Sequence, residues 1–529
     1  MSRAGSCVGH LAPVSPRPLC SRPAGICRSL KRGLSLALLW GVLLALSGTA
    51  RAGGMFVSPH GARPLGRGGA FVAGADDLNA IYYNPAGVAL ATTVGDPWLG
   101  AGSGGWSVLF DLGFVLQNVT YTRNENGILR PPVSGDGGLI GSVPLSIPQL
   151  AFARRLQPFS WGSLTLGFGL WIPYTGLLRY PEPSYATEAD IQRVPDVAPQ
   201  RYALLGLHEG SLSRSTVLAV LNPVASFSLL SDRLQLGIGP QLMVVYFRSR
   251  LMLNGCPQVM CRPEQPDYDT LVVAQAFAIT PAFNLGAIYR VMPWLRLGAA
   301  FQFPFLIRSA KGTVDTLLGT NEIFNGATVN GRDASLSMNL PPMLRVGAEF
   351  APLPDKLRVE LSYTVEFWSV QDAISFTPNG ITIENLKGIG SYPLGPVALR
   401  RDMQTTHSIS LGGEAKLWKY IGARLGGMFE SSGMPDATVS VLTPDNHKGL
   451  LSLGLFVPKV HFLSADWRID FSYGHIFQAD RVVDPAASQL YPSNPLRPDA
   501  TYPPGVGGTA AGTYAVSYDL ITLGFAVTR

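Results

Sequence analysis

The fold of this chain is decided by one stretch near its start, Gly66-Arg67-Gly68-Gly69-Ala70-Phe71-Val72-Ala73-Gly74-Ala75-Asp76-Asp77-Leu78-Asn79-Ala80-Ile81-Tyr82-Tyr83-Asn84-Pro85-Ala86-Gly87. Asp76 and Asp77 can cap a helical turn over 78–83, and Asn84 can cap a second turn that has Pro85 at its first position. From about residue 105 onward, short alternating segments follow one another without the pattern of an ordinary helix. This order predicts a small helical plug followed by a long run of strands.

Fourteen later segments have the composition and alternation of β-strands. They lie near residues 105–123, 148–157, 162–173, 217–230, 233–249, 271–290, 294–308, 334–351, 356–370, 402–417, 420–431, 448–458, 465–478 and 512–528. Their connections alternate between short turns, such as Ser231-Asp232, and long loops, such as 174–216. An even strand count with brief turns at one end and long loops at the other is typical of outer-membrane barrels. The sequence therefore predicts an all-β fold, a 14-stranded antiparallel transmembrane β-barrel.

Alternation within the segments supports a barrel in a membrane. In 357–367 the odd positions are apolar and the even positions are mostly charged or hydroxylated. A soluble β-sandwich also alternates, but its connections have no regular length code. Charged residues make up only 14% of the chain, and Trp161, Trp294 and Trp418 lie beside short turns, where a periplasmic aromatic girdle is expected.

The first 52 residues have the features of a secretory signal peptide. Six basic residues and no acid precede the apolar stretch 33–47, and Ala50-Arg51-Ala52 offers small residues at the cleavage spacing. Removal of 1–52 takes 7 of the 41 Lys and Arg residues and leaves 34 against 35 acids. The formal charge of +6 therefore belongs to the leader, and it predicts no nucleic-acid partner.

Two of the five cysteines, Cys256 and Cys261, remain after the leader is removed. Their spacing could suit a metal, but no second pair or nearby His completes a site. Export favours a disulfide, so we expect Cys256 and Cys261 to be joined within one outer loop, and we expect no metal and no cofactor.

The run from Ala75 to Gly87 resembles the hatch signature of the outer-membrane long-chain fatty acid transporter family (FadL-type), which also includes importers of aromatic hydrocarbons. Weaker echoes extend the resemblance over nearly the whole chain after the leader. They are the segments 340–347, 355–358 and 463–470. The resemblance implies an N-terminal helical hatch inside the lumen, at 53–103, followed by the barrel at 104–529.

The resemblance also implies where a site should lie. The hatch motif Asn84, Pro85, Ala86 and Gly87 is expected to face a kinked third strand that forms a lateral opening. In this sequence Gly167, Gly169 and Pro173 share the lumen face of that strand, and two glycines with a strand-end proline suit a poorly paired strand. Inward-facing arginines could contact a ligand carboxylate, although porin lumens carry charged residues as well. These arginines are Arg358, Arg424 and Arg468.

Three classes of function fit a barrel with a plug. An uptake channel for hydrophobic compounds is favoured, because an open diffusion porin for small polar solutes needs no folded plug. A barrel enzyme acting on lipids is the third class, but no strong catalytic pattern is present, and 100–105, which fits G-x-G-x-x-G, is followed by a strand instead of a helix. We therefore expect a monomeric channel, not an enzyme, in a Gram-negative outer membrane. Its partners would be outer-membrane lipid, lipopolysaccharide and a hydrophobic small molecule, either a fatty acid or a hydrocarbon.

Overall fold

The computed structural model describes most of the chain after the predicted leader. The described residues are 51–52, 59–92, 105–125, 127–129, 132–137, 139–140, 143–156, 158–176, 178–179, 216–257, 266–354, 356–441, 443–463, 465–490, 494, 496–497 and 510–529. They belong to one compact unit, Ala50–Arg529. Apart from Arg51 and Ala52, the predicted signal peptide lies outside them. Among these residues, no helix is both long enough and apolar enough to span a bilayer.

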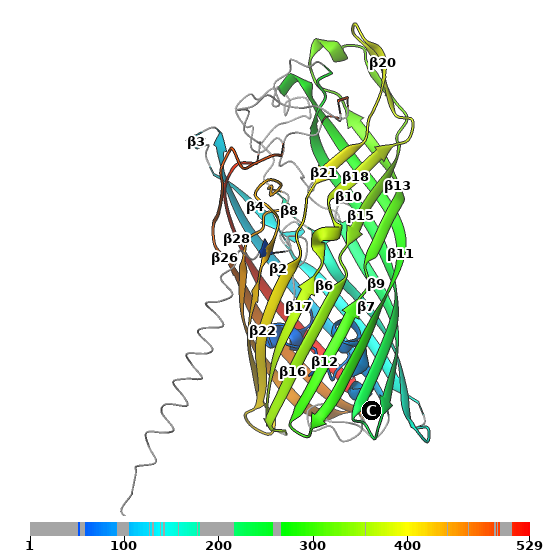
Figure 1. Ribbon diagram of the computed structural model, residues 1–529, viewed down its shortest axis with the longest axis vertical. Coiled ribbons are helices and arrows are strands. Elements are labelled where there is room, and N and C mark those ends of the chain that lie inside the picture. Colours follow the sequence, from blue (N-terminus) through cyan, green and yellow to red (C-terminus); the bar gives the residue numbers. More distant parts are fainter. Residues whose placement is uncertain are drawn as a thin grey trace, which may run out of the picture. The chain divides into compact units, whose positions relative to one another are not determined.

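Fourteen spanning segments form a closed antiparallel barrel, as the sequence predicts (Figure 1). They are β2 (Trp106–Glu125), β6 (Val143–Arg155), β7 (Gly162–Gly176), β9 (Thr216–Leu229), β10 (Leu234–Asn254), β11 (Asp269–Met292), β12 (Leu295–Gln302) with β13 (Phe305–Leu317), β16 (Met343–Leu353) with β15 (Asp333–Leu340), β17 (Leu357–Glu366) with β18 (Ala373–Pro378), β22 (Thr406–Lys416) with β21 (Val397–Arg400), β23 (Gly422–Glu430), β25 (Lys448–Phe462), β26 (Ala465–Gln478) and β28 (Gly512–Thr528). Each segment pairs with its neighbours in the chain, and β2 pairs with β28 from Ser107↔Thr528 to Arg123↔Gly512 to close the ring. The prediction of a 14-stranded barrel is confirmed.

Four of the spanning segments are each divided into two pieces, and two of these pieces, β18 and β21, lie beyond the predicted strands 356–370 and 402–417. The break between β12 and β13 contains Pro304, and the break between β15 and β16 contains Pro341 and Pro342. Proline has no backbone N–H to donate, so it interrupts the ladder. The other two breaks lie between β17 and β18, at η5 (Trp368–Val370), and between β21 and β22.

Side chains alternate between the lipid side and the lumen along the strands. On β17, Arg358, Glu360 and Ser362 are buried inside, whereas Leu361 and Tyr363 are exposed outside. The tryptophans beside the short turns lie on the outer surface: Trp161 is 57% exposed, Trp294 43% and Trp418 71%. An outward apolar face with aromatic residues near its edge is the surface expected of a barrel in lipid.

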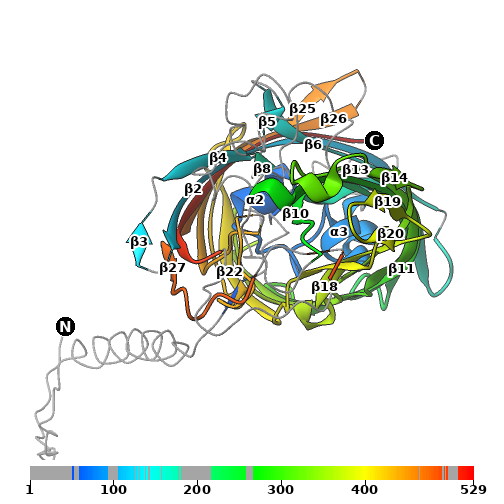
Figure 2. The same ribbon diagram turned by 90° about the horizontal axis from the view of Figure 1, so that it is seen from above.

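Three short helical elements fill the half of the barrel that carries the short turns. They are α2 (Ala62–Gly66), α3 (Ala80–Tyr83) and η1 (Pro85–Thr92), and Figure 2 shows α2 and α3 inside the ring of strands. We call residues 59–92 the hatch. Asn84 ends α3, and its side-chain oxygen accepts a hydrogen bond from the Ala86 N–H, so it caps η1 as expected. Asp77 accepts from the Asn79 N–H, while Asp76 forms no cap and instead contacts arginines.

The remaining elements belong to the loops and strand extensions. They are β1 (Arg51–Ala52), β3 (Ile128–Leu129), β4 (Val133–Gly137), β5 (Leu139–Ile140), β8 (Leu178–Arg179), η3 (Pro266–Tyr268), η4 (Glu322–Phe324), β14 (Thr328–Asn330), β19 (Thr382–Leu386), β20 (Gly390–Pro393), β24 (Ser432–Gly433) and β27 (Arg481–Val483). Strands β14, β19 and β20 form a separate small sheet, and β1 pairs with β24.

Candidate functional site

On β10 and β26 the inner surface changes from polar to apolar toward the long loops. At the level of the hatch, inward positions of β10 and β26 are glycine, glutamine, serine or charged residues. Toward the long loops the same strands present Met243, Val245, Phe247 and Ile476. These residues belong to one buried apolar cluster that also includes inward side chains of other strands, among them Val119, Leu218, Val272, Leu336 and Val516. We call this region the apolar lumen.

Pairs of glycines on neighbouring strands hold the hatch against the wall. The pairs are Gly237 and Gly286, Gly298 and Gly347, and Gly412 and Gly426. A Cβ added at Gly298 would lie 2.7 Å from the Cα of Ala73, and one at Gly286 would lie 2.8 Å from the Cδ of Pro85. Real Cβ atoms do not approach other atoms so closely, so each pair leaves space that only the hatch backbone fills.

Ion pairs join the hatch to the wall between β12 and β26. Six arginines (Arg63, Arg67, Arg296, Arg358, Arg424, Arg468) meet six carboxylates (Asp76, Asp77, Glu349, Glu360, Glu414, Asp470). Arg63 lies 2.7 Å from Asp76 and 2.6 Å from Glu414. Burial alone would raise the pKa of Asp76, but the arginines around it outweigh burial and hold that pKa well below its ordinary value. Because the charges in this network are equal in number, it has no surplus cation.

The expected role of the inward arginines is therefore corrected. Arg358 contacts Asp76 and Glu414, Arg424 contacts Glu414 and Asp470, and Arg468 contacts Asp77 and Asp470. These three arginines face inward as predicted. The carboxylates they meet belong to the protein itself: Arg358 and Arg468 anchor the hatch through Asp76 and Asp77, and Arg424 joins carboxylates of the wall.

The hatch motif lies elsewhere than expected. Asn84 donates hydrogen bonds to the carbonyls of Val72, at 2.9 Å, and of Ala287 on β11, at 3.1 Å, while Pro85 and Ala86 pack on Gly237 of β10. Gly87 packs against the Ala75 carbonyl within the hatch. The motif thus faces the fifth and sixth strands, and the expectation that it faces the third strand is wrong. The reason is that the glycine pair on β10 and β11 gives its backbone room.

Other hatch residues reach the third strand, β7. A Cβ at Gly167 would lie 3.3 Å from Val88, and the hydroxyls of Thr92 and Thr165 are 3.2 Å apart. Near the loop side of the strand, the ring of Tyr82 lies 6.3 Å from that of Trp171, and His60 contacts the carbonyl of Pro173. Gly169 and Pro173 are buried on the lumen side, as alternation predicts.

The barrel wall is unpaired beside β7. The β6–β7 ladder runs from Arg155↔Thr165 to Leu150↔Leu170, and in the described residues 143–149 of β6 do not pair with 171–176 of β7. On its other side, the β7–β9 register shifts between Trp171 and Tyr174. Farther along, β4 pairs with both β2 and β8 and bridges the two sides. We call the stretch between 143–149 and 171–176 the wall gap.

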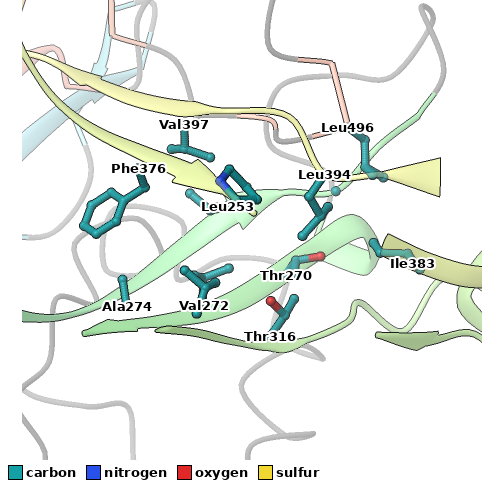
Figure 3. A pocket seen from close by; sticks show the side chains of 13 residues that line it. Leu253, Thr270, Val272, Ala274, Thr316, Phe376, Ile383, Leu394, Val397 and Leu496 are labelled. Carbon is teal, nitrogen blue, oxygen red and sulfur yellow. The ribbon is translucent and has the colours of Figure 1, made fainter. Parts of the chain in front are cut away.

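Among the described residues, cavities along the inner surface include one near the long loops and one beside the hatch. The first has about 560 Å³ of empty space, open to solvent, and is lined almost wholly by apolar side chains near the long loops (Figure 3). Leu253, Val272, Phe376 and Val397 lie around it, and Leu496 comes from the last long loop. The second cavity has about 290 Å³ of empty space, open to solvent, and lies between the start of the hatch and strands β2, β6 and β28. Its lining residues include His60, Val115, Ile147, Gln149 and Leu520.

Cys256 is buried and disulfide-bonded. Cys261 lies outside the described residues, so the pairing of the two cysteines stays a prediction. Among the described residues no group of three or more His, Cys, Asp or Glu side chains could hold a metal ion.

Sequence reasoning missed the glycine pairs, the hatch-side carboxylates and the polar residue Gln149. The glycines carried a usable signal, because each occupies an inward position by alternation. Their pairing across neighbouring strands needs the register, which the sequence does not specify to the residue.

Comparison with known proteins agrees with this geometry. A family model described as outer membrane protein transport protein (OMPP1/FadL/TodX) matches residues 204–505. That range is more than half of the 529 residues, so the chain belongs to this family of outer-membrane transport proteins. A location in the outer membrane of a Gram-negative bacterium follows. No curated protein matches the chain in sequence.

Solved structures share the fold at low sequence identity. A FadL homologue from Pseudomonas aeruginosa is 15% identical, with 90% of this chain and 99% of that chain covered and a TM-score of 0.64. The toluene transporter TodX from Pseudomonas putida is 16% identical, with 90% of this chain and 98% of that chain covered and a TM-score of 0.54. The toluene transporter TbuX from Ralstonia pickettii is 16% identical, with 88% of this chain and 97% of that chain covered and a TM-score of 0.51. Likeness at these identities shows the architecture alone.

Proposed function

We propose that this family member is an uptake channel for hydrophobic compounds, which enter among the outer loops, cross the apolar lumen and leave sideways through the wall gap. The observation that carries the proposal is that the wall gap adjoins a lumen lined by apolar side chains. Long-chain fatty acids and aromatic hydrocarbons are the cargo classes that fit, and TodX and TbuX, which share the fold, are described as toluene transporters.

The lining of the barrel favours this function over that of a diffusion porin. A water-filled porin has a polar interior. Here many inward residues above the hatch form one apolar cluster, and the cavity near the loops is bounded by Leu253, Val272 and Phe376. A polar solute would lose its hydration in this region without gaining hydrogen bonds, whereas an apolar solute leaves water at a gain of about 25 cal/mol per Å².

Lateral release also suits the cargo. Each CH₂ group that stays out of water saves about 0.8 kcal/mol, so an alkyl chain that passes from the lumen directly into the bilayer avoids a large cost. We further propose that the outward apolar surface contacts outer-membrane lipid and lipopolysaccharide, and that the chain works as a monomeric transporter and not as an enzyme, since one chain closes the barrel by itself.

Bulky residues beside the wall gap test the route. A Cβ at Gly169 would lie 2.9 Å from the indole nitrogen of Trp171, so Gly169→Leu should push that ring toward the gap. We expect uptake of radiolabelled oleic acid or toluene by cells to fall about tenfold, because overpacking costs about 1–3 kcal/mol and about 1.4 kcal/mol corresponds to that factor. Gly427→Leu is the matched control, since a Cβ there meets only a carbonyl at 3.4 Å.

Heat-modifiable migration on gels establishes that both variants fold. A folded Gly169→Leu variant that transports at the parental rate would rule out the lateral route. A path along the barrel axis past the hatch would then have to replace it.

A further inference from the structure

Two polar side chains face the lumen where the wall gap begins. Leu150 and Leu170 form the last register pair of β6 and β7, so the next opposed positions are Gln149 and Trp171. Both side chains are on the inner surface, where Gln149 is 3% and Trp171 2% exposed. They are therefore the first side chains at the opening itself.

Each carries a buried polar atom without a partner. The Oε1 atom of Gln149 and the Nε1 atom of Trp171 have no hydrogen-bond partner among the described residues. Leaving such an atom unsatisfied is costly, which is why nearly all buried polar atoms are paired. One of these two atoms is an acceptor and the other is a donor, and they lie on opposite sides of the gap.

Packing fixes the position of the indole. The ring lies over Gly169, where a Cβ would be 2.9 Å from Nε1, and it packs near the ring of Tyr82. Gln149 lines the 290 Å³ cavity together with Ile147 and His60. The donor is thus held in place by its own strand and by the hatch, and the acceptor borders space that a small group can enter.

Two charged side chains lie near these atoms: Asp111, the buried register partner of Gln149 on β2, which accepts from the Ala62 N–H, and Arg345 beside Tyr82. Burial lowers the pKa of His60 to about 4, so its imidazole is neutral at ordinary pH. The six arginines of the ion-pair network are matched by carboxylates. Arg345, the other buried arginine beside the hatch, lies over the ring of Tyr82 at 4.9 Å and donates to the Tyr82 carbonyl. A carboxylate beside the buried Asp111 would place two like charges together, so a neutral head group suits the Gln149 side of the gap better than an anion.

We propose that Gln149 and Trp171 form a head-group site at the wall gap, which binds the neutral carboxyl group of an amphipathic cargo. The carboxyl C=O accepts from Trp171 Nε1–H, and its O–H donates to Gln149 Oε1. The proton comes from bulk water, and the apolar lumen favours the protonated acid because burial disfavours the charged form. This inference rests on the proposed lateral route and adds how the polar head group of the cargo is bound at the wall gap.

Three cargoes of equal chain length test the site. Cells of a Gram-negative host without a channel of this family, expressing the full chain, are supplied with labelled decanoic acid, 1-decanol or n-decane. Gln149→Leu removes the acceptor, and Trp171→Phe removes the donor while keeping a ring. Gln275→Leu, on the outward side of β11, and Trp161→Phe, on the outer surface, are the matched controls.

We expect each test substitution to lower uptake of the acid and of the alcohol about fivefold, the factor that corresponds to one buried hydrogen bond. Decane uptake and both controls should stay at the parental level. An equal fall for all three cargoes, or no fall for any, would overturn the site, and loss for the acid alone would show recognition of the anion instead. If the parental protein takes up none of the three, the proposed function fails, and this inference with it.

Discussion

The contact between Gly298 and the hatch offers a direct test of how the hatch is held. Gly298 pairs with Gly347 across β12 and β16, and the hatch residues Val72 and Ala73 lie against this pair. The N–H groups of Val72, Ala73 and Gly74 all donate to the carboxylate of Glu360, at 2.6, 2.9 and 2.9 Å. Adding one methyl group by Gly298→Ala should therefore disturb three hydrogen bonds at once.

The expected displacement follows from the distances. The new Cβ would lie 2.7 Å from the Ala73 Cα, whereas ordinary contact begins at 3.4 Å, so the hatch backbone must move by about 0.7 Å, the difference of the two. The three hydrogen bonds to Glu360 would then lengthen beyond the usual range of about 2.7–3.2 Å. Overpacking of this kind costs about 1–3 kcal/mol of unfolding free energy.

Denaturant unfolding of the refolded barrel, followed by gel migration, measures this cost, and planar-bilayer recordings report whether the hatch still blocks ions. We expect a lower midpoint and raised conductance for Gly298→Ala, and parental values for Gly427→Ala, whose Cβ meets no atom closer than 3.4 Å. Glu360→Gln weakens the same contacts, so the double variant should lose less than the sum of the two. A Gly298→Ala protein with the same unfolding midpoint and the same low ion conductance as the control would refute the reasoning.

Further predictions concern the ion pairs, pH and the cysteines. Asp76→Asn leaves buried arginines short of one charge and should lower the unfolding free energy by about 3–5 kcal/mol, whereas Lys387→Met, which breaks an exposed pair with Glu322, should leave the midpoint unchanged. Because the folded pKa of Asp76 is depressed, its contribution to the unfolding free energy is present above the unfolded pKa near 4 and is lost as pH falls through the folded value. Unfolding measured at a series of pH values should therefore show the difference between the parent and Asp76→Asn shrinking only in strong acid. Cys256 and Cys261 should resist thiol labelling of intact cells until reductant is added, and rapid labelling without reductant would count against their pairing.

The barrel could be predicted from the sequence because its signals are local. The period of two, the turn residues and the alternation of loop lengths each depend on short segments, and together they placed all fourteen spanning segments near their observed positions. The strand breaks at Pro304 and at Pro341-Pro342 were readable too, since proline cannot donate to a ladder, but they fall inside segments that otherwise alternate well.

The contacts of the hatch could not be predicted in the same way. Alternation placed Arg358 and Arg468 on the inner surface, but the partner of each depends on how the hatch is turned inside the lumen. Asn84 shows the same limit, since its reach to Ala287 follows from the space above Gly237 and Gly286. Such contacts join residues about 200 or more positions apart, and no short pattern records them.

The two halves of the lumen together favour an exit through the wall. Passage along the axis would require the hatch to leave a network of six arginines and six carboxylates, and breaking even one buried pair costs about 3–5 kcal/mol. It would then deliver the alkyl chain into periplasmic water, at about 0.8 kcal/mol for each CH₂ group. The side route carries neither cost, because β6 and β7 are already unpaired beyond Leu150 and Leu170. What remains for a cargo with a polar end is the desolvation of that end, and Gln149 and Trp171 lie where that cost arises.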